Sequence, residues 1–169
     1  MTKSKEFNVG EQVVYPPHGV GSITEKVTQS IGGVNIEVFV ISFTREKMTL
    51  SVPVKRAEPA GLRHLSSNSR VKKALIVLNG KAKPNKKMWN RRAQEYDTKL
   101  NSGDMSKVAE IVRDLHPNVG IAERSYSERV IYENAFTLVA EEMAAIRKIN
   151  LKDANEILLE ELTAKEEMS

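Results

Sequence analysis

The sequence predicts a two-domain α+β protein in which a small β-barrel, residues 1–65, precedes a five-helix bundle, residues 66–169. Two observations carry this prediction. Before residue 65 the apolar residues come in short runs rich in valine, isoleucine and threonine, separated by glycine and proline. After residue 66 they recur every three or four positions, which is the period of an amphipathic helix. The change of period marks the expected domain boundary.

Four runs predict strands in the first domain. They cover residues 13–15, 20–28, 34–43 and 48–54. Between the second and third runs, Gly32 and Gly33 predict a tight hairpin turn, because both positions tolerate positive φ. Four or five short strands in about 55 residues are typical of a small SH3- or Tudor-like barrel.

The third run is apolar on both faces toward its end. One face carries Val34, Ile36, Val38 and Val40, and the other carries Phe39, Ile41 and Phe43. We therefore expect this strand to lie in the interior of the sheet. The fourth run contains Pro53, which has no N–H to donate to a ladder, so we expect that run to be an edge strand or to end there.

Five stretches of the second domain have the helical spacing of apolar residues. Their expected inward-facing residues are Val71, Leu75 and Leu78; Trp89, Ala93, Tyr96 and Leu100; Met105, Val108, Val112 and Leu115; Tyr132, Phe136, Val139, Met143 and Ile146; and Ala154, Leu158 and Leu162. Gly80 is expected to end the first helix, Pro84 suits the first turn of the second, and Asp104 suits the N-cap of the third. Ser125 and Glu128 predict a capping box at the start of the fourth.

The net charge of +4 hides a strongly basic block. Residues 66–100 contain 10 basic and 2 acidic side chains, whereas residues 101–169 contain 8 basic and 14 acidic ones. Such an asymmetry is typical of a face that binds a polyanion. Charge alone leaves open the alternative that the block is a solvated helix surface.

No motif in the sequence points to catalysis. His18, His64 and His116 are scattered and the chain has no cysteine, so the sequence offers neither a metal-ligand motif nor a cysteine nucleophile. We expect a protein that is not an enzyme, with no catalytic or metal-binding residue, no cofactor and no small-molecule substrate. No apolar run follows the first lysines and none reaches the length of a membrane span, so we expect no signal peptide, no membrane partner and a cytoplasmic location.

The basic block contains the only tryptophan, Trp89, with Lys86, Lys87, Arg91 and Arg92 around it. In the expected helix the two lysines fall in the first turn, where the macrodipole disfavours each cation by roughly 0.3–1 kcal/mol. Such an arrangement weakens the free helix but concentrates positive potential that can face phosphates. We therefore predict that this segment binds nucleic acid.

Trp89 itself allows two interpretations. Its spacing with Ala93, Tyr96 and Leu100 fits a core residue, whereas its place at the end of that stripe, among cations, fits an exposed indole. An exposed indole can stack on an unpaired base or wedge between base steps. The residues alone favour neither interpretation.

Four segments carry a resemblance that extends along essentially the whole chain. They are VGEQVVYPPHGVG at 9–21, LSVPV at 50–54, WNRR at 89–92 and LNSGDMSKVAEIVRDL at 100–115. Through them the chain resembles the CarD/CdnL family of bacterial transcription regulators that bind RNA polymerase. The resemblance implies a Tudor-like domain that docks on the β-subunit lobe of the polymerase. It also implies a helical domain that binds promoter DNA at the upstream edge of the transcription bubble.

The resemblance assigns roles to the residues of the basic block. Trp89 matches the family tryptophan that wedges into the minor groove and stabilises the open complex. Arg91 and Arg92 match basic positions that contact the DNA backbone, and Lys86 and Lys87 add charge beside them. A further family lysine is replaced by glutamine at position 94.

The resemblance also assigns the polymerase contact to one strand. Pairing of an edge strand with the polymerase, a form of β-augmentation, is implied for residues 47–52. The contacting residues would be Lys47, Thr49, Leu50, Ser51 and Val52, together with Gln29. Gln29 and Ser51 occupy positions that are arginine in family members.

Two other functions remain open at this point. A small barrel joined to a basic helix would also suit an RNA-binding or ribosome-associated accessory protein. A protein–protein adaptor, with Trp89 in the core and the lysines solvated, is the other alternative. We expect a monomer, because one polymerase offers one site.

Overall fold

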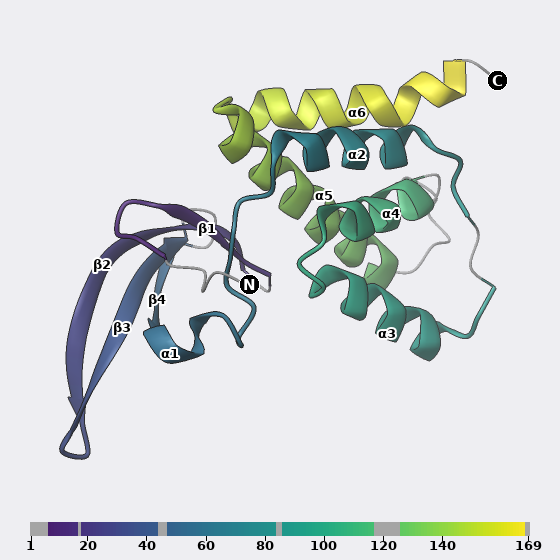
Figure 1. Ribbon diagram of the computed structural model, residues 1–169. Coiled ribbons are helices and arrows are strands. Elements are labelled where there is room, and N and C mark those ends of the chain that lie inside the picture. The colour runs from purple at the N-terminus through teal and green to yellow at the C-terminus, as the bar shows by residue number, and fades with distance from the viewer. Residues whose placement is uncertain (1–6, 17, 44–46, 84–85, 117–125, 168–169) are drawn as a thin grey trace, which may run out of the picture. The chain divides into compact units, whose positions relative to one another are not determined.

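The computed structural model describes residues 7–16, 18–43, 47–83, 86–116 and 126–167. The chain divides into two compact units, residues 1–65 and 66–169, whose elements are labelled in Figure 1. The described part of the first unit holds five strands and one short helix, and that of the second holds five helices. The predicted two-domain α+β class is confirmed.

The first unit is built on an antiparallel sheet with the strand order β4-β3-β2-β1-β5. The strands are β1 (Gln12–Tyr15), β2 (Gly19–Ile31), β3 (Val34–Phe43), β4 (Met48–Pro53) and β5 (Arg63–His64). As predicted, β3 lies inside the sheet and β4 at its edge. A single-turn helix, α1 (Val54–Ala57), was not predicted and begins directly after Pro53, which is its N-cap.

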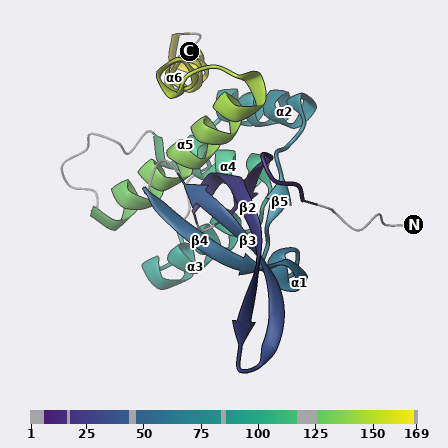
Figure 2. The same cartoon turned by 90° about the vertical axis from the view of Figure 1, so that its left-hand side faces the viewer.

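Strands β2 and β3 form a long hairpin, seen in Figure 2. Gly32 and Gly33 form its turn with φ of 58° and 82°, which confirms the predicted turn. The ladder of β4 on β3 ends at Val38, so β4 does not accompany the outer part of the hairpin. Val34 is consequently 61% exposed although it was expected to share a face with the buried Val38.

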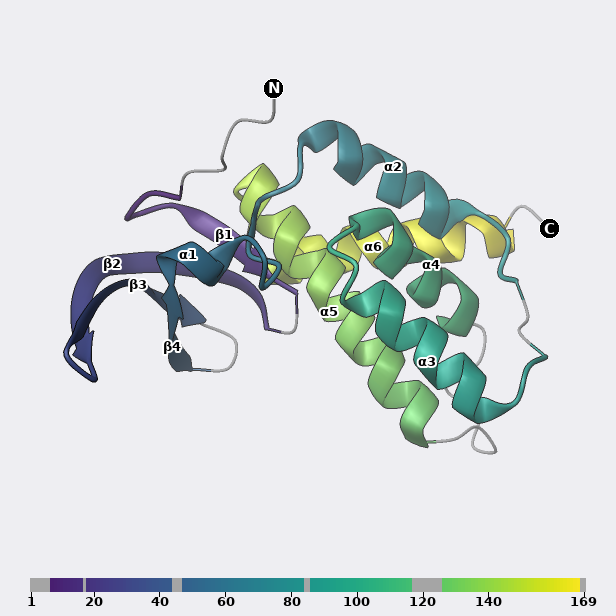
Figure 3. The ribbon, with the colours of Figure 1, turned by 60° about the horizontal axis from the view of Figure 1, so that its bottom comes forward.

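The second unit consists of α2 (Asn68–Asn79), α3 (Trp89–Leu100), α4 (Met105–Leu115), α5 (Tyr126–Arg147) and α6 (Leu151–Glu167). Helix α4 packs against α2, α3 and α5, while α6 packs against α2 and α5. Figure 3 shows α4 between α2 and α3. The buried residues of these helices form one apolar core.

Several helix ends follow from local sequence. Gly80 ends α2, and Asp104 caps α4 by accepting a hydrogen bond from the Ser106 N–H at 2.9 Å, so both predictions are confirmed. Pro84 and Ser125, on which two other predicted helix starts depend, lie outside the described residues.

The predicted inward-facing residues are buried or half-buried with one exception, Trp89. Thirteen of them are buried, namely Val71, Leu78, Tyr96, Met105, Val108, Val112, Leu115, Tyr132, Val139, Met143, Ala154, Leu158 and Leu162. Within the described ranges, no helix has the length and apolar character needed to cross a membrane.

Candidate nucleic-acid interface

The basic block is divided between two helices. Arg70, Lys72 and Lys73 are exposed on α2, whereas the cations near Trp89 belong to α3 and to the segment before it. Helix α4 packs against both helices and lies between them in Figures 1 and 3. The sequence block therefore gives two separate groups of cations, and the one on α3 combines positive charge with an aromatic side chain.

Helix α3 begins at Trp89, and its N-cap, Met88, makes no side-chain capping bond. Lys86 and Lys87 are exposed and precede the helix, so the prediction that they lie in its first turn is wrong. The extended backbone of Met88 (φ −60°, ψ 150°) separates them from the helix. The first turn instead carries Arg91 and no acidic residue, so the unfavourable dipole interaction falls on Arg91.

Trp89 lies at the surface of the second unit. Its side chain is 36% exposed, while the preceding Met88 is 82% exposed and Tyr96, two turns along the helix, is only 5% exposed. The apolar core of the unit includes Tyr96 but not Trp89. Of the two interpretations of this tryptophan, the structure supports the exposed one.

Arg92 has surroundings very different from those of its exposed neighbour Arg91. Its Nη2 pairs with Oε1 of Glu128 on α5, and the two side chains are only 17% and 7% exposed. The same nitrogen donates a hydrogen bond to the Tyr96 hydroxyl at 3.2 Å. The guanidinium also lies over two rings, 5.6 Å from the centroid of Trp89 and 5.8 Å from that of Tyr96.

These contacts keep Arg92 charged. Burial lowers the pKa of its guanidinium, but the hydrogen bonds to Tyr96 and Glu128 raise it, and the net effect is a pKa above the ordinary value. The positive charge of Arg92 is therefore already matched by a carboxylate inside the protein. The resemblance implies that Arg92 contacts the DNA backbone, and this role stays a prediction.

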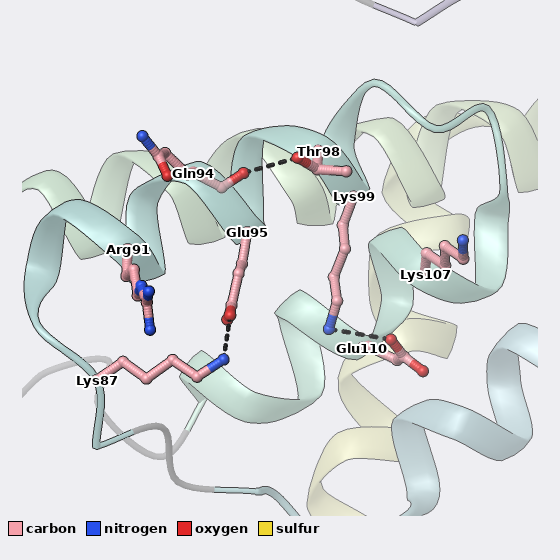
Figure 4. A pocket seen from close by; sticks show the side chains of 8 residues that line it. All are labelled: Lys87, Arg91, Gln94, Glu95, Thr98, Lys99, Lys107 and Glu110. Carbon is pink, nitrogen blue, oxygen red and sulfur yellow. Dashed lines mark hydrogen bonds and ion pairs between the residues drawn. The ribbon is translucent and has the colours of Figure 1, made fainter.

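An open groove of about 530 Å³ runs between α3 and α4 (Figure 4). Its lining residues are Lys87, Arg91, Gln94, Glu95, Thr98, Lys99, Lys107 and Glu110. Lys87 pairs with Glu95, and Lys99 Nζ lies 3.1 Å from Glu110 Oε2. Among the described residues Arg91 and Lys107 form no ion pair, so these two cations can meet an external anion.

Glu128 is the residue of this site that sequence reasoning missed. Its position three residues after Ser125 predicts a capping box, which stays a prediction because Ser125 lies outside the described residues. In the structure its carboxylate pairs with Arg92, which is 36 residues away in the sequence. An acidic residue in the first turn of α5 is favourable to the helix dipole in any case. The local pattern therefore gave no sign of the long-range partner.

The predicted polymerase-binding residues lie on and beside β4. Thr49 and Ser51 are exposed on this edge strand, Leu50 is half-buried and Val52 is buried. Lys47 is exposed just before the strand, in a left-handed conformation with φ of 50°.

Gln29 is exposed on the outer part of the β2–β3 hairpin. It pairs with Ile36 of β3, whereas Ser51 pairs with Val40 of the same strand. Ile36 and Val40 are four positions apart, about 13 Å along β3 at 3.3 Å per residue, so Gln29 and Ser51 lie at different heights of the sheet.

No group of three or more His, Cys, Asp or Glu side chains that could hold a metal ion is found in the part of the chain that the structure describes. His64 and His116 have other partners. His64 contacts Glu11, and Nδ1 of His116 lies 2.8 Å from the Tyr132 hydroxyl.

Comparison with known proteins covers both units. Residues 7–66 match the model of the CarD-like/TRCF RID domain, and residues 73–168 match that of the CarD C-terminal domain. The chain is also 23% identical over 146 residues to "Putative transcription factor YdeB" of Bacillus subtilis (strain 168), an alignment that covers 86% of this chain and 95% of the relative. The two domain matches occur in the order of the two units of the structure, and the chain belongs to the CarD family.

Proposed function

We propose that this protein docks on the β-subunit lobe of RNA polymerase and stabilises the open promoter complex by inserting Trp89 into the minor groove at the upstream edge of the bubble. One observation carries the proposal. The only tryptophan is exposed among cations at the start of a helix whose first turn has no acidic residue. Membership of the CarD family, whose regulators interact with RNA polymerase, supplies the partner.

Docking would use the free edge of β4. An edge strand has a row of backbone groups that its own sheet does not use, and an extended segment of another protein can add to it. In this proposal Thr49 and Ser51 present side chains to the polymerase, and Leu50 and Val52 hold the strand to its sheet. Lys47 and Gln29 would make the flanking contacts.

Trp89 would then meet DNA that the polymerase has already distorted. An apolar side chain that enters intact duplex must unstack a base step, which costs a few kcal/mol. At the edge of an open bubble the strands are already separated, so most of this unstacking free energy does not have to come from the indole. The indole is therefore expected to bind opened DNA more tightly than closed DNA.

The exposed cations would hold the DNA backbone beside the tryptophan. Arg91 is exposed in the first turn of α3, and Lys86 and Lys87 are exposed just before the helix. Phosphate contacts of this kind fix position without reading sequence. We leave Arg92 out of this group, because its pair with Glu128 is shielded from water, with side chains 17% and 7% exposed, whereas the pair of Lys87 with Glu95 is open to solvent, with side chains 53% and 39% exposed.

The effect on transcription follows from differential affinity. A protein that binds the open complex more tightly than the closed complex shifts the equilibrium toward the open form by that difference in free energy. A difference of about 1.4 kcal/mol would change the ratio of the two forms about tenfold. Docking on the polymerase keeps the helical unit close to the promoter, so weak DNA contacts suffice.

The decisive measurement is the lifetime of open complexes formed by RNA polymerase holoenzyme with the full-length chain. We expect Trp89→Ala to shorten this lifetime to that of polymerase alone, and Trp89→Phe to keep part of the effect. Met88→Ala is the matched control, because Met88 is the neighbouring exposed apolar residue. A wild-type lifetime with Trp89→Ala would contradict the wedge.

Footprinting separates this function from binding to RNA. Protection of the upstream bubble edge that disappears with Trp89→Ala is the expected result. Protection of a structured RNA with no protection of the promoter would instead support the accessory protein of RNA or ribosomes.

A further inference from the structure

We propose that Arg92 and Glu128 are positioning residues for Trp89, and that the ion pair between them fixes the guanidinium against the indole and so sets the direction in which the ring projects. The value of a fixed ring rests on the proposed function. The positioning itself is a property of the free protein and can be measured without polymerase or DNA.

Three side chains lie together on one face of α3. Trp89, Arg92 and Tyr96 follow one another at spacings of three and four residues, which brings their side chains together on a helix. The guanidinium carbon of Arg92 lies 5.6 Å from the indole centroid and 5.8 Å from the Tyr96 centroid. Tyr96 is buried, so Arg92 links a fixed ring to a half-exposed one.

Two bonds keep the Arg92 guanidinium from turning away from the indole. Nη2 of Arg92 is bound both by the Glu128 carboxylate and by the Tyr96 hydroxyl. Glu128 is nearly buried in the first turn of α5, where the helix dipole favours its charge. A carboxylate and a guanidinium that both have little access to water stabilise one another, so loss of either partner is costly.

Helix α3 is attached to the rest of the unit through α4 and α5. Helix α3 packs against α4, and the pair of Arg92 with Glu128 ties its first turns to α5 as well. Trp89 is the first residue of α3, where helix ends fray most readily. An anchor one turn into the helix therefore holds the part that carries the indole.

These surroundings divide the roles of the two neighbouring arginines. Arg91 is exposed and has no ion pair among the described residues, so it can bind a phosphate without losing an internal contact. Arg92 would have to give up Glu128 to do the same. The geometry thus assigns phosphate binding to Arg91 and support of the indole to Arg92.

The side chain at position 92 must be arginine for this role. A lysine could still pair with Glu128, but its ammonium is a compact charge without the planar fork that can lie against two rings and hold two acceptors. Arg92→Lys therefore keeps the charge balance of the interior while removing the flat support.

The experiment uses the fluorescence of Trp89, which is the only tryptophan of the full chain. Acrylamide quenching and time-resolved anisotropy are measured on the wild type, Arg92→Lys and Glu128→Gln. We expect both variants to raise the quenching constant of Trp89 above the wild-type value and to widen the local motion of the ring, because each loosens the contact of the guanidinium with the indole. Far-UV circular dichroism and urea unfolding establish that each variant is folded.

Matched controls separate positioning from a general change of charge or helix content. Arg91→Lys makes the same replacement one residue earlier at an exposed site, and Glu133→Gln removes a carboxylate from an exposed site on α5. Neither should change the quenching or anisotropy of Trp89. Should Arg92→Lys or Glu128→Gln fail to fold, Tyr96→Phe, which keeps the ring and removes one acceptor of Nη2, tests the same arrangement.

Wild-type quenching and anisotropy in a folded Arg92→Lys or Glu128→Gln protein, or in Tyr96→Phe where that variant takes their place, would overturn the proposal. This failure is distinct from a failure of the proposed function. If the indole becomes mobile in Arg92→Lys but Trp89→Ala has no effect on open-complex lifetime, the positioning holds and the proposed function fails. If Trp89→Ala shortens the lifetime but the indole of Arg92→Lys behaves as in the wild type, the proposed function holds and the positioning fails.

Discussion

Gly21 lies so close to Phe43 that a Cβ atom added to it would stand 2.8 Å from Cε1 of the ring, and also 2.8 Å from Cγ2 of Ile41. Phe43 and Ile41 are completely buried in the core of the first unit. Neither can move aside without disturbing its own packing. We predict that Gly21→Ala lowers the free energy of unfolding of this unit by about 1–3 kcal/mol, the usual effect of overpacking a core.

Urea unfolding followed by circular dichroism measures this loss, and Trp89 fluorescence reports separately on the second unit. Phe43→Leu replaces the ring with a smaller side chain and so relieves the clash. The double variant Gly21→Ala/Phe43→Leu should therefore lose less unfolding free energy than the sum of the losses in the two single variants. Strict additivity of the two changes would show that the clash is not the cause.

The edge strand β4 allows a prediction about docking. Ser51 is exposed on the strand that we propose as the docking edge. The resemblance to the family implies a basic residue at this position, so Ser51→Arg should strengthen binding to the polymerase β subunit. One added charge pair at an exposed site is worth about 0.5–1 kcal/mol, or a two- to fivefold lower Kd. Ser51→Glu, with the opposite charge, should weaken binding by a similar factor.

Surface plasmon resonance with the isolated β-subunit lobe measures both effects, and unfolding curves should be unchanged because the side chain is exposed. Equal affinities for the arginine and glutamate variants would place the polymerase contact away from this strand.

The sequence predicted the elements whose causes are local. The Gly32-Gly33 turn depends on the φ angles of two adjacent residues, and the cap of α4 depends on Asp104 and an N–H two residues away. The burial of Tyr96 and Val112 follows from the period of apolar residues within one helix. Such features need no knowledge of the rest of the chain.

The features that the sequence did not show depend on distant partners or on where an element stops. Arg92 and Glu128 are 36 residues apart, and each had a plausible local role that concealed the pair. Lys86 and Lys87 were placed in a helix that begins only at Trp89. Val34 shares a strand face with Val38 in the sequence pattern, but the sequence does not show that β4 stops opposite Val38 and leaves Val34 exposed.

The exposed cations of α3 lead to a prediction about salt. Each phosphate neutralised on duplex DNA contributes about −0.9 to the slope of log K against log salt concentration. Arg91→Gln should therefore make the slope for DNA bound in the polymerase complex less negative by about 0.9. The measurement is a titration of promoter binding between low and physiological salt, with polymerase present throughout.

Lys152→Gln is the control for this change, because it removes one exposed cation from α6, away from α3. It should leave the slope at the wild-type value. If both variants change the slope equally, the effect reflects total charge and not a phosphate contact at Arg91.

The buried hydroxyl of Tyr132 should make the protein less stable at alkaline pH. Burial raises the pKa of Tyr132 to about 12, above the value near 10 of an unfolded tyrosine. As the pH rises through 10 the unfolded chain loses this proton first, which favours unfolding, and the effect grows until the folded tyrosine ionises near pH 12. The stability associated with Tyr132 is thus present below pH 10 and falls by about 2–3 kcal/mol between pH 10 and 12.

Tyr132→Phe removes this part of the pH dependence, so the difference in unfolding free energy between wild type and variant should shrink or reverse from pH 9 to pH 12. At neutral pH the variant should be less stable by about 0.5–1.5 kcal/mol, because His116 loses its hydrogen bond to the hydroxyl. Urea unfolding at each pH measures both quantities, and the effect of lysine titration on stability is the same in wild type and variant and so cancels in the difference.

Tyr126→Phe, at a ring that is 78% exposed, should leave neutral-pH stability unchanged. A constant difference between wild type and Tyr132→Phe across this pH range would mean that Tyr132 titrates alike in the folded and unfolded chains.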